Sequence, residues 1–210
     1  MYTTKVGGFH LRQKTGTPGL TVSRTTAEET RRLTSFINER TSIGSLVPVT
    51  METVSGWVSE GYSLVARVGS SIVGHSAFYP FEEAHLGGEN RSQVVDVAFQ
   101  GRGIYTALFI GSILLVSELP GGTDMSIFLH KGPGSDGLGL VKDLGFVKLR
   151  VFDGHGNPNE AALSRLPARM RFDATKEGRG PLWDIYQGRI PRLLEADLKG
   201  ILRRAGWEIA

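Results

Sequence analysis

The residue types best suited to chemistry in this 210-residue chain are gathered in one short segment. It reads Val94-Val95-Asp96-Val97-Ala98-Phe99-Gln100-Gly101-Arg102-Gly103-Ile104-Tyr105. An apolar strand meets a turn whose glycines let the backbone reverse tightly, and a buried helix is predicted at 103–117. The free N–H groups that begin a helix favour a phosphate, and Arg102 adds a full positive charge. We therefore predict a ligand-phosphate site here, with a plain strand-to-helix loop as the alternative.

Composition limits the chemistry that can surround this turn. Hydrophobic residues make up 40% and charged residues 21% of the chain, so we expect a folded core. The net charge of +3, from 24 basic and 21 acidic residues, permits an anionic ligand without requiring a nucleic acid. The absence of cysteine excludes disulfides, cysteine-bound zinc and a thiol nucleophile. We predict no metal site.

Hydrophobic periodicity and turn residues predict alternating strands and helices before residue 153. Thr26 and Glu29 match a capping box, Thr50 is a helix cap, and Gly69-Ser70 is a hairpin turn signal. The predicted elements are strands at 20–24, 62–68, 71–79, 93–99, 125–130 and 146–152, and helices at 27–40, from Met51 to Gly61, at 103–117 and up to Leu144.

The remaining segments differ in composition from this region. Residues 1–19 form a loose arm, with a short strand predicted at Phe9–Leu11. Residues 154–210 form a Gly/Arg-rich extension that ends in an amphipathic helix near 191–205. We predict a domain at 1–153 followed by this extension, which either packs on the domain or binds a partner.

The order of elements over Leu20–Arg150 resembles the GNAT superfamily of N-acetyltransferases. Its acetyl-CoA pyrophosphate loop, Q/R-x-x-G-x-G/A, corresponds to Gln100–Tyr105, and Leu144-Gly145-Phe146 resembles the family's frequent L-G-F. The chain departs from the family pattern at two positions. Tyr105 stands where the loop has Gly or Ala, and Val141 stands where the family has its general-acid tyrosine.

The resemblance implies an α/β fold with a central mixed sheet flanked by helices, followed here by a helical C-terminal extension. It implies acetyl-CoA as co-substrate and direct transfer of the acyl group to an amine in a ternary complex, without a cysteine nucleophile. Pantetheine is expected between 94–99 and 125–130, with an amide near Val95 holding the thioester oxygen. The residues expected to bind the cofactor are Val95, Val97, Gln100, Gly101, Arg102, Gly103, Ile104 and Tyr105.

An attacking amine must lose a proton, and the leaving thiolate must gain one. Asp96 is the first candidate base, because a carboxylate in an apolar strand needs a hydrogen bond or a cleft. Glu82 and Glu83, in the loop after the hairpin, are further candidates or else solvated loop carboxylates. Tyr105 is a candidate donor to the thiolate.

Two histidines in predicted strands belong to the same question. His75 and His130 either relay protons or serve as hydrogen-bonded structural residues.

Two other functions stay open at this point. The glycine turn 132–137 matches G-x-G-x-x-G and is followed by a strand ending near Asp153, which would suit an NAD-type oxidoreductase. The helix after it is short for a parallel crossover, which disfavours this reading. The other alternative is a catalytically altered GNAT-fold module that binds a partner.

The expected partner is a small-molecule or protein amine. Nucleic acid is a weakly supported alternative that rests on Arg165, Arg169, Arg171 and Arg179, and a homodimer is an arrangement that the sequence allows. The apolar run 104–116 is shorter than the ~20 residues that cross a bilayer, and no signal peptide is visible. We therefore expect no membrane association and a cytoplasmic location.

Overall fold

A computed structural model describes residues 10–14, 16–40, 48–81, 87–118, 124–130, 137–152, 155, 157–166 and 183–210. The chain divides into two compact units, which are described separately. Unit 1 comprises Met1–Tyr79, Asn90–Leu119 and Asp197–Ala210, and unit 2 comprises Pro80–Glu89 and Pro120–Ala196. The last residues of the chain, from Asp197, belong to unit 1.

Strands of unit 1 run in the order β5-β4-β3-β2-β1-β9. Their bounds are β1 Leu11–Gln13, β2 Leu20–Arg24, β3 Ser63–Val68, β4 Ser71–Pro80, β5 Gly88–Val95 and β9 Trp207–Ile209. The pairs β9–β1, β1–β2, β2–β3 and β3–β4 are antiparallel. The final strand of the chain thus lies beside the first.

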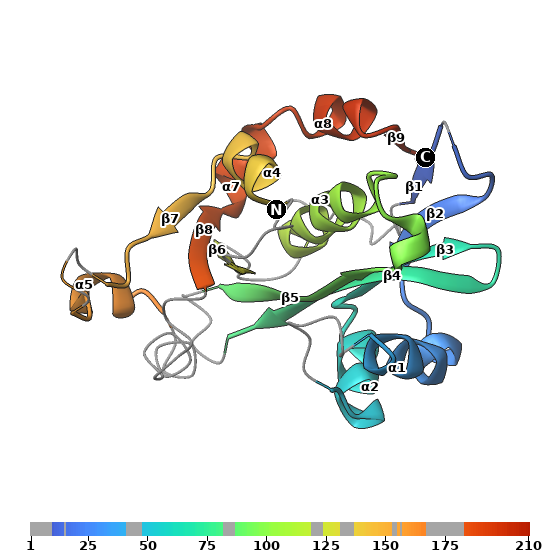
Figure 1. The fold of residues 1–210 in the computed structure, drawn as a ribbon, viewed down its shortest axis with the longest axis horizontal. Coiled ribbons are helices and arrows are strands. Elements are labelled where there is room, and N and C mark those ends of the chain that lie inside the picture. The colour runs from blue at the N-terminus through green and yellow to red at the C-terminus, as the bar shows by residue number, and fades with distance from the viewer. Residues whose placement is uncertain are drawn as a thin grey trace, which may run out of the picture. The chain divides into compact units, whose positions relative to one another are not determined.

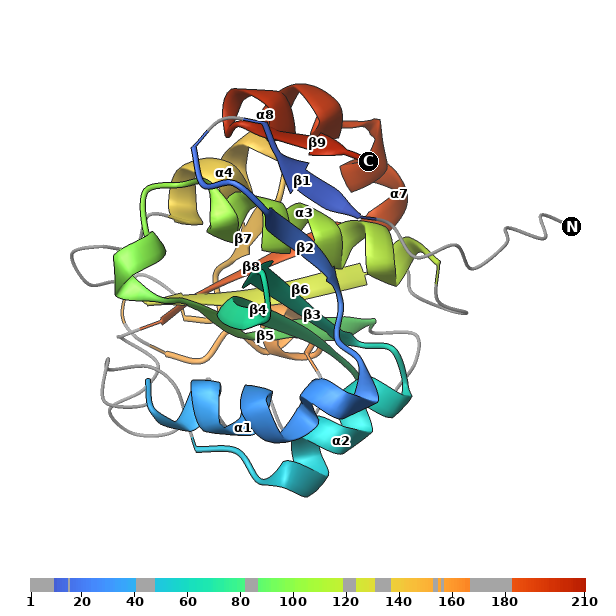
Figure 2. The same cartoon turned by 90° about the vertical axis from the view of Figure 1, so that its right-hand side faces the viewer.

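Helices cover both faces of this sheet, as Figure 2 shows. On one face, α1 (Thr30–Asn38) and α2 (Met51–Ser59) pack Phe36 and Trp57 into a cluster with Val65, Ala77 and Val94. On the other face lies α3 (Ile104–Ser117), which is apolar all round and buried along most of its length. Helix α8 (Leu198–Arg204) contacts α3.

Close packing of α3 depends on Gly74 in β4. A Cβ built there would stand 3.0 Å from an Ile104 methyl group and 3.1 Å from one of Leu108. Because glycine has no side chain, the first turn of α3 approaches the strand directly. The position of the sheet therefore determines where α3 begins.

Unit 2 has strands in the order β7-β8-β6-β5. The bounds are β6 Asp124–His130, β7 Val147–Leu149 and β8 Trp183–Arg189, with helices α4 Gly137–Asp143, α5 Glu160–Leu163 and α7 Ile190–Glu195. Strand β6 pairs in parallel with the start of β5 at Gly88–Met125 and Glu89–Ser126, and β8 is antiparallel to both β6 and β7. The core of unit 2 includes Phe81, Leu149, Val151, Leu163, Leu166 and Ile185.

The mixed α/β fold and most predicted elements are confirmed. The Thr26 N–H donates to Glu29 Oε2 at 2.9 Å, and Thr50 Oγ1 accepts from Thr53 N at 3.1 Å, so both predicted helix starts are capped. Val68 pairs with Ser71 around the Gly69-Ser70 turn. These features depend on neighbours in sequence, which is why the sequence predicts them.

Several predicted elements differ from the structure (Figure 1). The helix predicted at 27–40 begins with a 3₁₀ turn, Ala27–Glu29, and the strand predicted at 146–152 is Val147–Leu149. Strand β5 ends at Val95, and Val97–Phe99 is a 3₁₀ turn, not the end of a strand. The single helix expected near 191–205 is two helices, because Asp197 Oδ1 accepts from Gly200 N at 2.8 Å and caps a new one. The N-terminal strand is Leu11–Gln13, displaced from Phe9–Leu11, and β8 and β9 were not predicted.

Candidate functional site

The predicted phosphate turn lies in unit 1, between the end of β5 and the start of α3. Gly101 has φ +73° and Gly103 has φ +69°, in the left-handed region that glycine adopts without strain. The first backbone hydrogen bond into α3 runs from Ala107 N to the Gly103 carbonyl at 3.0 Å. The amides of Ile104, Tyr105 and Thr106 therefore precede the first intrahelical bond and are available to an anion by helix geometry.

Arg102 lies between the two glycines and is exposed. Its guanidinium donates to Thr17 Oγ1 and lies 5.4 Å from the centre of the Phe99 ring. These contacts hold a positive charge beside the start of α3, where it adds to the partial charge of the helix terminus. The turn combines backbone donors with a cation.

The backbone of β5 gives a second set of donors. Asp96 N donates to the Val73 carbonyl of β4 at 2.9 Å. Because successive N–H groups of an extended chain point to opposite sides, the N–H of Val95 points away from β4. Val97 follows in the 3₁₀ turn and is exposed.

Asp96, the first candidate base, is held by two donors. Oδ2 accepts from Arg40 Nη2, and Oδ1 accepts from Ala98 N at 3.0 Å, so the carboxylate caps the 3₁₀ turn. The hydrogen bond from Arg40 lowers the pKa of Asp96, burial opposes this effect, and the Ala98 N–H and the charge of Arg40 add to the lowering. A carboxylate with a lowered pKa is a weak proton acceptor.

Tyr105 points along α3, with its ring stacked on that of Phe109 at a centroid distance of 6.1 Å. Burial raises the pKa of the Tyr105 phenol to about 12, so the hydroxyl stays protonated at physiological pH. Among the other predicted residues, Val141 is fully buried in α4 of unit 2. Glu82, Glu83 and the side chain of His130 lie outside the described residues.

His75 lies in a closed polar network inside unit 1 and is 0% exposed. Its Nδ1 is 3.1 Å from the Ser92 carbonyl, which can only accept, so Nδ1 carries the proton. Nε2 then accepts from Ser63 Oγ at 3.1 Å, and Thr25 Oγ1 lies 2.6 Å from that hydroxyl. Burial lowers the pKa of His75 to about 4. These contacts support a structural role for His75, one of the two roles that the sequence allows.

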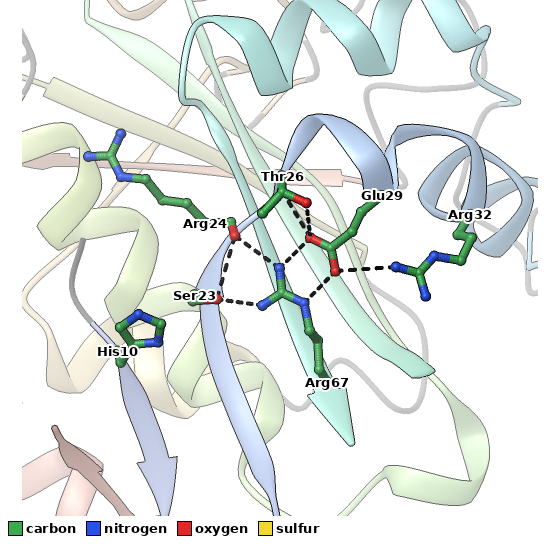
Figure 3. Close-up of a pocket in the computed structure, with 7 residues that line it drawn as sticks. All are labelled: His10, Ser23, Arg24, Thr26, Glu29, Arg32 and Arg67. Atoms are coloured by element: carbon green, nitrogen blue, oxygen red, sulfur yellow. Dashed lines mark hydrogen bonds and ion pairs between the residues drawn. The ribbon is translucent and has the colours of Figure 1, made fainter. Parts of the chain in front are cut away.

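A second polar cluster lines a surface pocket of about 370 Å³ in unit 1, drawn in Figure 3. The Arg67 guanidinium donates to the Glu29 carboxylate, to Ser23 Oγ and to the Arg24 carbonyl. Burial opposes ionisation of Glu29, but hydrogen bonds from Arg67 and Thr26 outweigh it and lower the pKa. The contacts of Arg67 join β2 and β3 to the 3₁₀ turn Ala27–Glu29 that precedes α1, so we read the cluster as structural.

The dinucleotide alternative is not favoured by the strand order of unit 2. Most of its glycine turn, residues 132–136, and Asp153 lie outside the described residues. The strands on either side of it, β6 and β7, are both hydrogen-bonded to β8, which lies between them. A dinucleotide-binding unit instead has two neighbouring parallel strands joined by its helix.

Within the part of the chain described, no group of three or more His, Asp or Glu side chains is placed to share a metal ion. Nor is any helix there both long enough and apolar enough to cross a membrane.

Comparison with known proteins adds to this geometry. Neither a family model nor a curated protein sequence matches the chain. Solved structures do: a putative acetyltransferase from Salmonella typhimurium with acetyl-CoA matches with a TM-score of 0.57 and 17% identity, over 81% of this chain and 94% of its own. An acetyltransferase of the GNAT family from Streptococcus pneumoniae matches with a TM-score of 0.54 and 12% identity. This match covers 81% of this chain and 99% of the acetyltransferase.

The chain has the GNAT fold.

A third structure with this fold is an N-acetylglutamate synthase from Neisseria gonorrhoeae, solved with coenzyme A and N-acetylglutamate. It has a TM-score of 0.59 and 16% identity, and the match covers 81% of this chain but only 35% of the synthase. At these identities the likeness concerns the GNAT fold alone. The residues that give the fold an activity must therefore be argued from the site itself.

Proposed function

We propose that this protein is an acetyl-CoA-dependent N-acyltransferase that transfers the acyl group directly to an amine. The observation that carries the proposal is the turn Gln100–Tyr105, whose left-handed glycines lead into the first turn of α3 in a chain with the GNAT fold. The pyrophosphate would lie against the amides of this turn and of Ile104 and Tyr105, with Arg102 beside it.

The transfer itself needs a donor for the developing oxyanion. The amine nitrogen attacks the thioester carbon, the C–N bond forms, and the C–S bond breaks as the thiolate leaves. The outward N–H of Val95 is the proposed donor to the oxygen during this step. No covalent intermediate on the protein is required, which agrees with the absence of cysteine.

The overall reaction moves one proton from the attacking amine to the leaving thiolate, and two side chains of unit 1 bear on this transfer. Since Arg40 and Ala98 N–H hold the Asp96 carboxylate, we propose that Asp96 fixes the end of β5 and thereby the direction of the Val95 amide. Its role as the base is the alternative, and the two roles are separated by a test described in the Discussion. Tyr105 remains the proposed donor to the thiolate, although a phenol with a pKa of about 12 is a weak acid.

Calorimetric titration of the full chain with CoA and acetyl-CoA tests the proposal. We expect saturable binding of both, with an affinity that falls as salt rises because the pyrophosphate is charged. NAD⁺ and NADH are the matched controls, since they carry a pyrophosphate without pantetheine. Absence of CoA binding at millimolar ligand by a folded protein would refute the proposal, and preferential binding of NADH would favour the oxidoreductase alternative.

A further inference from the structure

The carbonyl of Arg102 accepts two side-chain hydrogen bonds from opposite ends of the chain. Gln13 Nε2, in β1, donates at 2.9 Å, and Trp207 Nε1, in β9, donates at 3.2 Å. Gln13 and Trp207 are themselves direct partners in the antiparallel β1–β9 pair. Two cross-strand neighbours therefore converge on one peptide group of the predicted phosphate turn.

The Trp207 contact is a constrained one. The residue is 1% exposed, and an indole N–H can only donate, so a buried indole needs an acceptor. The same segment also packs against Gly103, where a Cβ would stand 2.5 Å from the Ala205 carbonyl and 3.1 Å from Trp207 Nε1. Any side chain at 103 would push the C-terminal segment away from the turn.

Gln13 also connects to the cation of the turn. Its Oε1 accepts from Thr17 N at 3.1 Å, and Thr17 Oγ1 accepts from the Arg102 guanidinium. The main chain of Arg102 is thus hydrogen-bonded to Gln13, and its side chain is hydrogen-bonded to Thr17. Gln13, Thr17 and β9 together hold the turn on the side that faces the edge of the sheet.

We propose that Trp207 and Gln13 are positioning residues for CoA binding, an inference that rests on the proposed function. Because a peptide group is planar and trans, fixing the Arg102 carbonyl toward β1 and β9 directs the N–H of Gly103 away from them. That N–H then joins the amides of Ile104 and Tyr105 on the ligand side of the turn. The last strand of the chain therefore sets the geometry of the anion site.

Two single variants and a control test this role. Trp207→Phe keeps the ring in the core and removes its donor, and Gln13→Met removes the other donor at similar volume. The control is Arg12→Ala, which breaks the exposed Arg12–Glu208 ion pair between the same two strands without touching the Arg102 carbonyl. The two readouts are the Kd of CoA by calorimetry and hydrogen exchange of the amides at 103–106 in the ligand-free protein.

We expect each donor variant to raise the Kd of CoA about fivefold, the effect of one ordinary hydrogen bond, and to speed exchange in the turn. The KM of acetyl-CoA should rise with kcat nearly unchanged, and Arg12→Ala should move neither readout. The inference is overturned if both donor variants fold and leave the exchange rates at 103–106 at the wild-type level. If the wild type binds no CoA, the proposed function fails and the positioning role fails with it. If the wild type binds CoA and both donor variants bind it equally well, the positioning role alone is refuted.

Discussion

Asp96 illustrates how contacts distant in sequence change the chemistry of a single side chain. In the sequence it is an isolated carboxylate in an apolar stretch, which suggests a base. In the structure Arg40, 56 positions away, donates to it and also lies 3.8 Å from the centre of the Phe36 ring. Phe36 of α1 thus positions the Arg40 guanidinium, and this guanidinium positions the Asp96 carboxylate.

Two variants separate a positioning role for Asp96 from a catalytic one. Asp96→Asn removes the carboxylate, and Arg40→Gln removes the same ion pair while the carboxylate stays. Each should lower the free energy of unfolding by about 2 kcal/mol, since a charge-assisted hydrogen bond is lost. If Asp96 positions β5, both variants slow turnover to a similar degree at constant CoA affinity. Loss of turnover in Asp96→Asn alone, measured as kcat against pH, would instead identify Asp96 as the base.

At the scale of elements, the turn between β5 and α3 is defined by two glycines with different surroundings. A Cβ at Gly101 would meet nothing within 4 Å, whereas one at Gly103 would collide with the Ala205 carbonyl. Gly101 is therefore required for its φ, and Gly103 is required for its φ and for the approach of the C-terminal segment.

Gly103→Ala should weaken CoA binding. It should also lower the free energy of unfolding by more than the left-handed backbone at position 103 alone accounts for. The matched control is Gly69→Ala in the β3–β4 hairpin, where φ is +57° and a Cβ would meet nothing within 4 Å. Gly69→Ala should lower the free energy of unfolding by about 1–2 kcal/mol, because only the left-handed backbone conformation opposes the new side chain. Chemical denaturation and CoA titration of both variants check this. Equal losses of stability, with CoA affinity retained in Gly103→Ala, would contradict the proposed site.

At the scale of the molecule, the buried His75 network couples stability to pH. The neutral imidazole is satisfied by the Ser92 carbonyl and the Ser63 hydroxyl, while protonation would place a net charge in a fully buried site. Ser92 has φ +51° within β5, so its carbonyl is presented from a strained backbone. Protonation of His75 would therefore disturb β3, β4 and β5 together.

Burial lowers the pKa of His75 in the folded protein to about 4, from the ordinary value of 6.5. The His75 contribution to the free energy of unfolding should accordingly be complete above about pH 6.5. It should decrease by about 3 kcal/mol in total as the pH is lowered toward 4. Urea denaturation across this range measures the slope. His75→Asn, whose side chain does not titrate, should be less stable at neutral pH and should lack this part of the slope. An unchanged slope in the variant would assign the acid sensitivity to other groups.

Local elements were determined by the sequence itself. The caps at Thr26 and Thr50, the Gly69-Ser70 hairpin and the all-apolar helix α3 depend on residues a few positions apart, and each was predicted and is confirmed. The glycines of the predicted phosphate turn belong to the same class, because their type permits the left-handed backbone that the structure shows at Gly101 and Gly103. The mixed α/β fold followed from the order of these elements.

Only the tertiary structure decided which side chains surround the turn. Arg40 contacts Asp96, just before the turn, from 56 positions away, and Gln13 and Trp207 contact Arg102 from 89 and 105 positions away. No local pattern marks any of the three. The strands β8 and β9 were not predicted for the same reason, since β9 has three residues and gains its hydrogen bonds from β1. Pairing across such distances depends on the whole chain being folded, so a strand of this kind leaves no periodic signal in the sequence.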